Sequence, residues 1–117
     1  MKQRFDLPPT LVFDNNGLQK VIVHSNEHQK NYHWGKTEMI HYTDSKGTPL
    51  NGILYYPANY DASKKYPMVV FIYETFSKYR HDYITPSLHN GIWFNIANLT
   101  TDGYAVLLPD ISFEKGN

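Results

Sequence analysis

The chain has 117 residues, about the length of one modest domain. Lysine plus arginine and aspartate plus glutamate number eleven each, so the sequence lacks the positive field on which nucleic-acid binding draws. Cysteine is absent, which excludes a disulfide framework and a thiolate nucleophile. No run approaches the ~18 apolar residues of a membrane span. We therefore expect a globular chain with no nucleic-acid partner and no membrane span.

The first predicted element is a β-hairpin. Residues 10–14 and 18–24 are short β-prone runs separated by Asn15-Asn16-Gly17, and Asn-Gly is a strong hairpin signal. Two strands alone are marginally stable in water, so this hairpin must pack on something or belong to a larger sheet. The polar residues 25–32 then read as a connector or short helix, and as a domain boundary.

The next two strands are predicted to pair antiparallel at one side of a sheet. Residues 37–42 alternate polar and apolar side chains, residues 44–47 supply a turn, and residues 52–56 form the second run before Pro57. An antiparallel pair of this kind is a common edge for an otherwise parallel sheet.

An uninterrupted apolar run over residues 68–73 predicts a central strand that is buried on both faces. Its parallel partner is the run at residues 104–108, and the connection is long enough for a crossover helix. Because functional groups in open α/β sheets gather where parallel strands end, residues 73–77 and 110–117 are where chemistry is expected.

The crossover helix is predicted from an apolar face made by Ile92, Trp93, Ile96, Ala97 and Leu99. Its N-cap is then Asn90, and Asp102-Gly103 ends it. The resulting fold class is α/β: a mixed sheet with an antiparallel strand pair followed by a βαβ unit.

Short motifs follow one another in a fixed order between residues 34 and 77: Trp34-Gly35, Glu38, Gly47, Leu54-Tyr55-Tyr56-Pro57, Tyr60-Asp61, Lys64-Lys65-Tyr66-Pro67, Tyr73 and Ser77. This ordered string resembles the prolyl oligopeptidase family of serine peptidases. In that family a β-propeller covers an α/β-hydrolase domain. The resemblance implies that residues 1–31 are a terminal propeller hairpin and connector. Residues 32–117 would then be the N-terminal part of the hydrolase domain, cut before the nucleophile elbow.

The resemblance also implies an activity, which is hydrolysis of short peptides by a serine, histidine and aspartate triad without a cofactor. The sequence contains no G-x-S-x-G elbow, and the family places all three triad members after this region. We therefore expect the chain alone to be inactive and the full-length protein to act on peptides. A periplasmic or secreted location would follow from the family, although the chain shows no signal peptide.

One functional residue can be carried over from the family. In relatives that resemble dipeptidyl peptidases, a tyrosine at the end of this strand donates its hydroxyl to the oxyanion, and Tyr73 occupies the matching place. The loop after the third strand of α/β-hydrolases contributes to the oxyanion hole, and a phenol can donate a strong hydrogen bond there. Residues 74–76 depart from the family pattern, and Glu74 is interpreted as a solvated or salt-bridged carboxylate.

The remaining candidate residues are interpreted structurally. His24, His28 and His33 have spacings that suggest metal ligands, but the segment is not predicted as one helix, so no metal site is expected. His81 and His89 are expected to make unspecific polar contacts. Six tyrosines could form an aromatic binding surface, but packing on a sheet edge and its loops is favoured over that use: Tyr55, Tyr56, Tyr60, Tyr66, Tyr79 and Tyr83.

Two other functions stay open at the level of sequence. One is a non-enzymatic β-rich binding module, and the other is an esterase or lipase that shares the hydrolase fold. We also expect the chain to associate with itself, because the strand at residues 104–108 would have an open, apolar edge.

Overall fold

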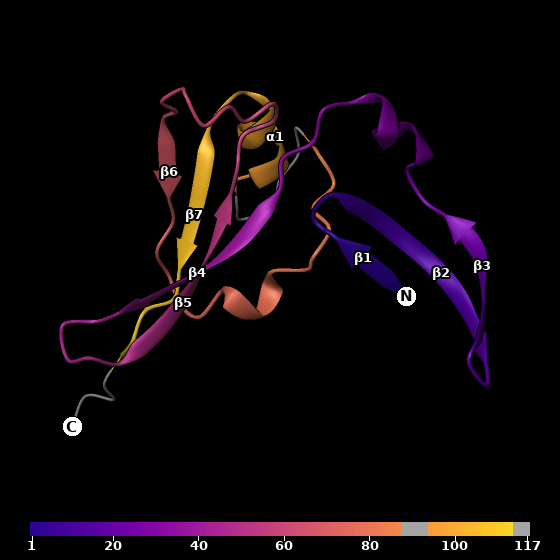
Figure 1. The fold of residues 1–117 in the computed structure, drawn as a ribbon, viewed down its shortest axis with the longest axis horizontal. Helices are drawn as coiled ribbons and strands as arrows, with labels where there is room; N and C mark the ends of the chain where they lie inside the picture. Colours follow the sequence, from indigo (N-terminus) through magenta and orange to yellow (C-terminus); the bar gives the residue numbers. More distant parts are fainter. Residues whose placement is uncertain (88–93, 114–117) are drawn as a thin grey trace.

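The computed structural model describes residues 1–87 and 94–113, whose strands form two sheets (Figure 1). The first sheet has the order β1-β2-β3, with β1 (Lys2–Arg4), β2 (Leu7–Asn15) and β3 (Leu18–His24). The second has the order β4-β5-β7-β6, with β4 (Thr37–Thr43), β5 (Pro49–Tyr55), β6 (Met68–Val70) and β7 (Ala105–Pro109). The described helices are η1 (Glu27–Asn31), η2 (Ser77–Tyr79) and α1 (Ile96–Thr101).

The predicted N-terminal hairpin is confirmed. Strands β2 and β3 pair antiparallel up to Asn15 and Leu18, and the turn needs positive φ angles of 50° at Asn16 and 89° at Gly17. Asparagine and glycine tolerate this region best, which explains the turn sequence. Strand β1 pairs with the other side of β2 and was not predicted, because three residues are too few to show a pattern.

The pairings predicted within the second sheet are also confirmed. Strands β4 and β5 are antiparallel throughout, from Thr37 opposite Tyr55 to Thr43 opposite Pro49. Strands β6 and β7 are neighbours and parallel, with Val69 beside Val106. The sheet is therefore mixed, with an antiparallel pair at one side as the sequence indicated.

The predicted position of the apolar run at residues 68–73 is wrong. Only residues 68–70 form a strand, β6, which lies at the edge of the sheet, and Met68 and Val70 are about half exposed. The central position belongs to β7, which lies between β5 and β6 and buries Val106 completely. The edge expected at residues 104–108 is therefore not open. An apolar run indicates that a segment favours a β-strand. It does not determine the neighbours of that strand, because these depend on where segments distant in the chain pair with it.

Helix α1 begins later than expected. Its N-cap is Asn95, whose side chain accepts a hydrogen bond from the Asn98 backbone N–H at 3.0 Å. The predicted N-cap Asn90 lies outside the described residues, as do Ile92 and Trp93. The predicted end is confirmed, since Gly103 follows the helix with a φ of 89°.

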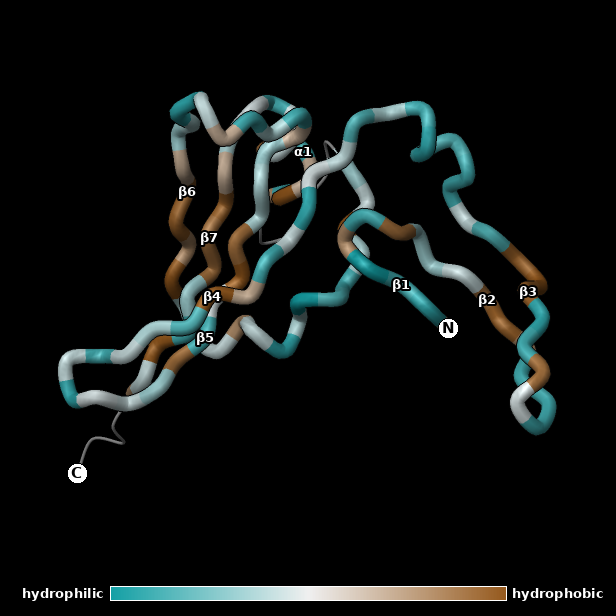
Figure 2. Tube along the Cα trace, viewed as in Figure 1, coloured by the Kyte–Doolittle hydropathy of each residue, from teal (hydrophilic) through white to brown (hydrophobic). Residues whose placement is uncertain are grey.

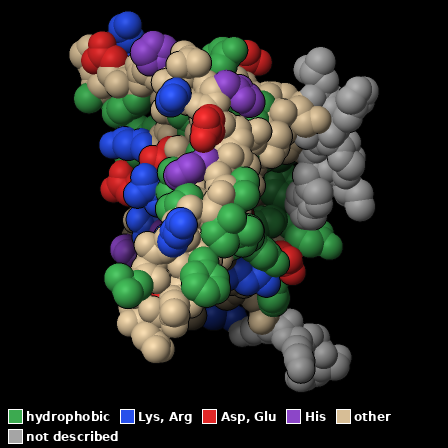
Figure 3. Space-filling model, turned by 90° about the vertical axis from the view of Figure 1, so that its right-hand side faces the viewer, with side chains coloured by type: hydrophobic (Ala, Val, Ile, Leu, Met, Phe, Trp, Pro, Cys, Tyr) green, Lys and Arg blue, Asp and Glu red, His purple; other side chains and the backbone are tan. Residues whose placement is uncertain are grey.

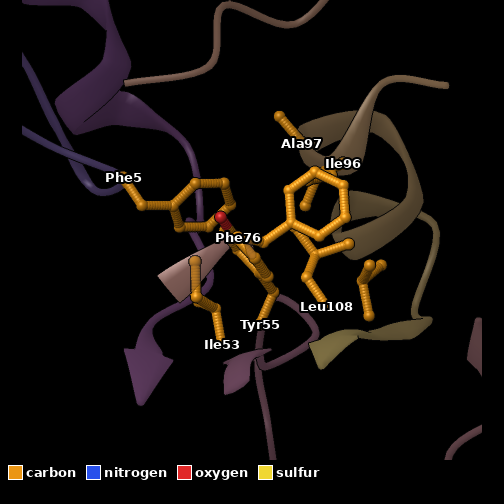
Figure 4. Close-up of a cluster of buried hydrophobic side chains, with 8 residues drawn as sticks. Phe5, Ile53, Tyr55, Phe76, Ile96, Ala97 and Leu108 are labelled. Atoms are coloured by element: carbon orange, nitrogen blue, oxygen red, sulfur yellow. The ribbon is translucent and has the colours of Figure 1, made fainter. Parts of the chain in front are cut away.

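A single hydrophobic cluster joins the two sheets (Figure 4). It combines side chains of β5, β7, α1, the loop after β6 and the turn between β1 and β2, and consists of Phe5, Ile53, Tyr55, Phe76, Ile96, Ala97, Val106 and Leu108. Figure 2 shows the hydrophobic stretches of β6 and β7 side by side. Phe5 is only 1% exposed and contacts the Tyr55 ring edge to face at a centroid distance of 4.9 Å. Phe5 thus links the turn of the first sheet to the core of the second, and the Trp34 indole N–H donates a hydrogen bond of 2.6 Å to the Phe5 carbonyl oxygen.

Candidate functional site

The loop after β6 carries the predicted site residues, and both of its ends are attached to β7. At its start, the Phe71 backbone N–H donates a hydrogen bond of 3.0 Å to the Leu107 carbonyl oxygen. At its end, Phe76 buries its ring in the hydrophobic cluster, where it lies 5.6 Å from the Phe71 ring. Between these two anchors the chain bends at residues 73–74, and the Ile72 side chain is 60% exposed.

Tyr73 and Glu74 lie in the exposed middle of this loop. Tyr73 is 61% exposed, and both residues occupy a bend rather than a strand. The side chain of Tyr73 thus emerges at the carboxyl end of β6, which is the edge where ligand-binding groups gather in open α/β sheets. The strand was expected to extend to Tyr73, but β6 ends at Val70, so Tyr73 lies three residues beyond the strand. The role of Tyr73 as an oxyanion donor stays a prediction.

The structure brings a buried carboxylate from the end of β7 to the far end of the same loop. Asp110 is 5% exposed, and its Oδ1 accepts hydrogen bonds from the backbone N–H groups of Phe76 at 2.7 Å and Ser77 at 2.8 Å. Two donors to one ionised oxygen form charge-assisted bonds, which are about twice as strong as neutral ones. Ser77 therefore serves as a backbone donor here.

Asp110 is itself held by the antiparallel side of the sheet. Its backbone N–H donates to the Asn51 carbonyl oxygen at 2.8 Å, and its carbonyl oxygen accepts a hydrogen bond from the Tyr42 hydroxyl. Burial raises the pKa of the Tyr42 phenol, and the nearby Asp110 charge raises it further. Tyr42 thus stays protonated and keeps donating at neutral pH.

Sequence reasoning pointed to the chain segment that begins at Asp110 but not to this contact. The signal was an aspartate directly after a buried apolar run. Its partners lie 34 and 33 residues earlier in the chain, so no local pattern could name them.

The histidines lie apart on the surface. His24, His28, His33 and His81 are all exposed, and His28 packs against the Tyr32 ring at 6.5 Å. Among the residues that the structure describes, no three histidine or acidic side chains group closely enough to hold a metal ion. His89 lies outside the described residues.

Most of the predicted tyrosines pack on neighbouring aromatic rings. Tyr60 lies 4.6 Å from the Tyr56 ring and 5.5 Å from the Tyr66 ring, while Tyr83 stacks on Trp34. Tyr55 is buried in the core. These contacts agree with a packing role, although Tyr60 and Tyr79 remain 43% and 42% exposed.

Two cavities flank the core, and neither is lined by Tyr73 or Asp110. One of about 630 Å³ lies along the first sheet and η1 and is lined by Asp6, Thr10 and His24, among others. The other, of about 550 Å³, lies under the loop at residues 76–87 and is lined mainly by aromatic and aliphatic side chains, including Phe71 and Phe94. The two ends of the loop that carries Tyr73, at Phe71 and Phe76, line this second cavity.

Two further findings concern the distribution of surface charge and the length of the helices. In Figure 3, side chains of both signs are interspersed on the visible face, so neither sign gathers into a patch there. Within residues 1–87 and 94–113, no helix has both the length and the apolar character that a bilayer crossing requires.

Comparison with solved structures identifies a peptidase-like fold. The chain superimposes on the apo structure of the AtxE2 isopeptidase with a TM-score of 0.63 and 22% identity over 92% of its length. It also superimposes on a serine-to-alanine variant of AtxE2 with Astexin3-dC4 bound, with a TM-score of 0.55 and 23% identity over 79% of its length. The matched regions are 16% and 13% of those two chains, so this chain spans a small part of its structural relatives.

No family model matches the chain, and no curated protein matches it. At 22–23% identity the likeness concerns the fold alone. The fold of this small, mixed-sheet chain therefore resembles one region of an isopeptidase.

Proposed function

We propose that this chain is the N-terminal part of the α/β-hydrolase domain of a serine peptidase of the prolyl oligopeptidase family. Residues 1–31 correspond in this proposal to the last hairpin of a propeller and its connector, and residues 32–117 to the start of the hydrolase domain. The whole protein hydrolyses peptide bonds in short peptides. The chain by itself is inactive, because its 117 residues contain no G-x-S-x-G elbow.

The observation that carries the proposal is the order of the second sheet. An antiparallel pair, β4 and β5, continues into β7, and β6 lies parallel on the far side of β7. This arrangement places the loop after β6 at the carboxyl edge, where a hydrolase assembles its reacting groups. The likeness to an isopeptidase supports the same assignment.

Tyr73 is proposed as a donor to the oxyanion. During peptide hydrolysis the carbonyl oxygen becomes negatively charged, and a phenol hydroxyl that is preorganised toward this oxygen stabilises the charge. Tyr73 follows β6 within three residues and is largely exposed at the edge of the sheet. Its partner in this proposal is therefore a peptide carbonyl.

The activity test uses the full-length protein that carries this chain. We expect it to hydrolyse short chromogenic peptides and to react stoichiometrically with a fluorophosphonate probe. Tyr73→Phe should lower kcat about a hundredfold or more with a small change in KM, because the lost hydrogen bond acts in the transition state. Initial rates over a range of peptide concentrations give both constants.

The matched control is Tyr79→Phe, which removes the same hydroxyl from a half-exposed tyrosine in the following turn. This variant should keep the wild-type kcat. A full-length protein that cleaves esters but no peptides would overturn the peptidase assignment in favour of an esterase, and one that reacts with neither would favour a binding module.

A further inference from the structure

Asp110 connects three parts of the second sheet to the Tyr73 loop. Its carboxylate accepts the backbone N–H groups of Phe76 and Ser77, and its own backbone is bonded to Asn51 of β5 and Tyr42 of β4. The backbone of Asp110 is therefore held by two strands, while its carboxylate holds the loop through two hydrogen bonds. A buried residue with hydrogen bonds to both its backbone and its side chain has little freedom to move.

The loop between its two anchors is short. The Phe71 N–H is bonded to Leu107, and a second attachment to the sheet is at Phe76. Both attachment points lie on or directly after β7, since Leu107 is in the strand and Asp110 follows it. Tyr73 lies between them, so its position depends on the separation of the two anchors.

The two anchors differ in strength. The Phe71 bond joins neutral backbone groups, whereas the Asp110 bonds join two N–H donors to an ionised oxygen. Removing the charge of Asp110 without changing its size would loosen the far end of the loop. The hydrogen bond at Phe71 and the strand pairing would remain.

We propose that Asp110 is the positioning residue for Tyr73, acting through the backbone N–H groups of Phe76 and Ser77. The inference rests on the proposed function, because it assumes that Tyr73 meets the peptide oxyanion. Asp110 does not touch the substrate in this account. It sets the distance at which the Tyr73 hydroxyl meets the developing charge, and a misplacement of about 1 Å can cost as much as a hundredfold in rate.

The experiment is a double-mutant cycle in the full-length protein with Asp110→Asn, Tyr73→Phe and the combined variant. Asp110→Asn should lower kcat about tenfold or more with little change in KM. The combined variant should be no slower than Tyr73→Phe alone, because positioning has no effect once the hydroxyl is gone. Amide hydrogen exchange at residues 71–77 should also become faster in Asp110→Asn.

The control is Asp61→Asn, which makes the same chemical change in a carboxylate that accepts a 2.9 Å bond from the Ser63 N–H outside the loop. It should leave kcat and the exchange of residues 71–77 unchanged. Thermal unfolding of each variant separates loss of position from loss of the folded state.

The outcomes separate the two proposals. A wild-type protein that hydrolyses peptides, with a Tyr73→Phe defect but a normal Asp110→Asn rate, overturns the positioning role alone. The positioning role also fails, with the proposed function intact, if the losses of the two single variants multiply in the combined one. A wild-type protein without hydrolysis overturns the proposed function and the positioning role with it. A wild-type protein that hydrolyses peptides, with a normal kcat for Tyr73→Phe, overturns the oxyanion role of Tyr73 and the positioning role but leaves the peptidase assignment intact.

Discussion

Tyr55 shows how burial changes the chemistry of a single side chain. Its ring is 1% exposed in the core, and burial, with a smaller contribution from the charge of Asp82, raises the pKa of its phenol to about 12. In the unfolded chain a tyrosine titrates near pH 10. The folded state therefore holds the Tyr55 proton more tightly than the unfolded state does.

The consequence is a loss of stability in alkali. The contribution of Tyr55 is complete below pH ~10 and disappears as the pH rises toward 12, at up to about 1.4 kcal/mol per pH unit. Tyr55→Phe should make the free energy of unfolding fall less steeply over this range, as measured by urea denaturation. Tyr32→Phe, at a 67% exposed ring, should follow the wild-type curve, and parallel curves for Tyr55→Phe and wild type would contradict the argument.

At the scale of elements, Phe5 contributes a fully buried ring to the core that the two sheets share. Phe5→Ala removes a ring that contacts Tyr55 and lies 6.0 Å from the Trp34 ring, so it should lower the free energy of unfolding by about 3–5 kcal/mol. Phe13→Ala is the matched control, since this ring of β2 is 56% exposed. Urea unfolding followed by intrinsic fluorescence compares the two, and equal losses would contradict this contribution of Phe5 to the shared core.

The elements that were predicted correctly are those whose structure is determined by residues adjacent in the sequence. Asn16-Gly17 specified the hairpin, Gly103 ended α1, and apolar runs identified β6 and β7 as parallel partners. The order of the strands was not predictable in this way, because burial on both faces depends on neighbours that are distant in the chain. Phe5 was missed for a similar reason: it is a single aromatic residue between Arg4 and Asp6 and belongs to no periodic pattern.

In the candidate site, too, features with a local cause were predicted from the sequence, and contacts between distant segments were not. The segments at residues 73–77 and 110–117 were both expected to carry chemistry, because the ends of apolar runs are visible in sequence. The contact of Asp110 with the N–H groups of Phe76 and Ser77 was not predictable, since it depends on β7 returning beside β6.

The whole molecule is less compact than its length suggests. Its radius of gyration is 16.8 Å, against about 13 Å for a compact domain of this size. The excess comes from two sheets that share one small core, visible as two separate groups of strands in Figure 1. Apolar side chains of β2 and β3 remain exposed as a result, including Leu11, Phe13, Leu18 and Val23.

Strand β6 is one of the two edge strands of the second sheet, and β4 is the other. The backbone of β6 and its flanks bonds to β7 through Pro67 and Phe71, so the intervening residues Met68 and Val70 direct their N–H and C=O groups outward. An exposed apolar edge of this kind is a template for another strand. We expect an antiparallel pairing of two copies of β6 that is centred on Val70. Self-association is therefore expected through β6 instead of through β7.

Light scattering on the 117-residue chain over a range of concentrations tests this expectation. Val70→Lys should shift the chain toward the monomer, because a charge at the centre of the pairing meets its own copy. Val21→Lys introduces the same charge at a similarly exposed valine of β3, 44% against 49%, and should leave the association unchanged. A monomeric wild-type chain at every concentration would refute association, and an effect of Val21→Lys alone would assign it to the hairpin.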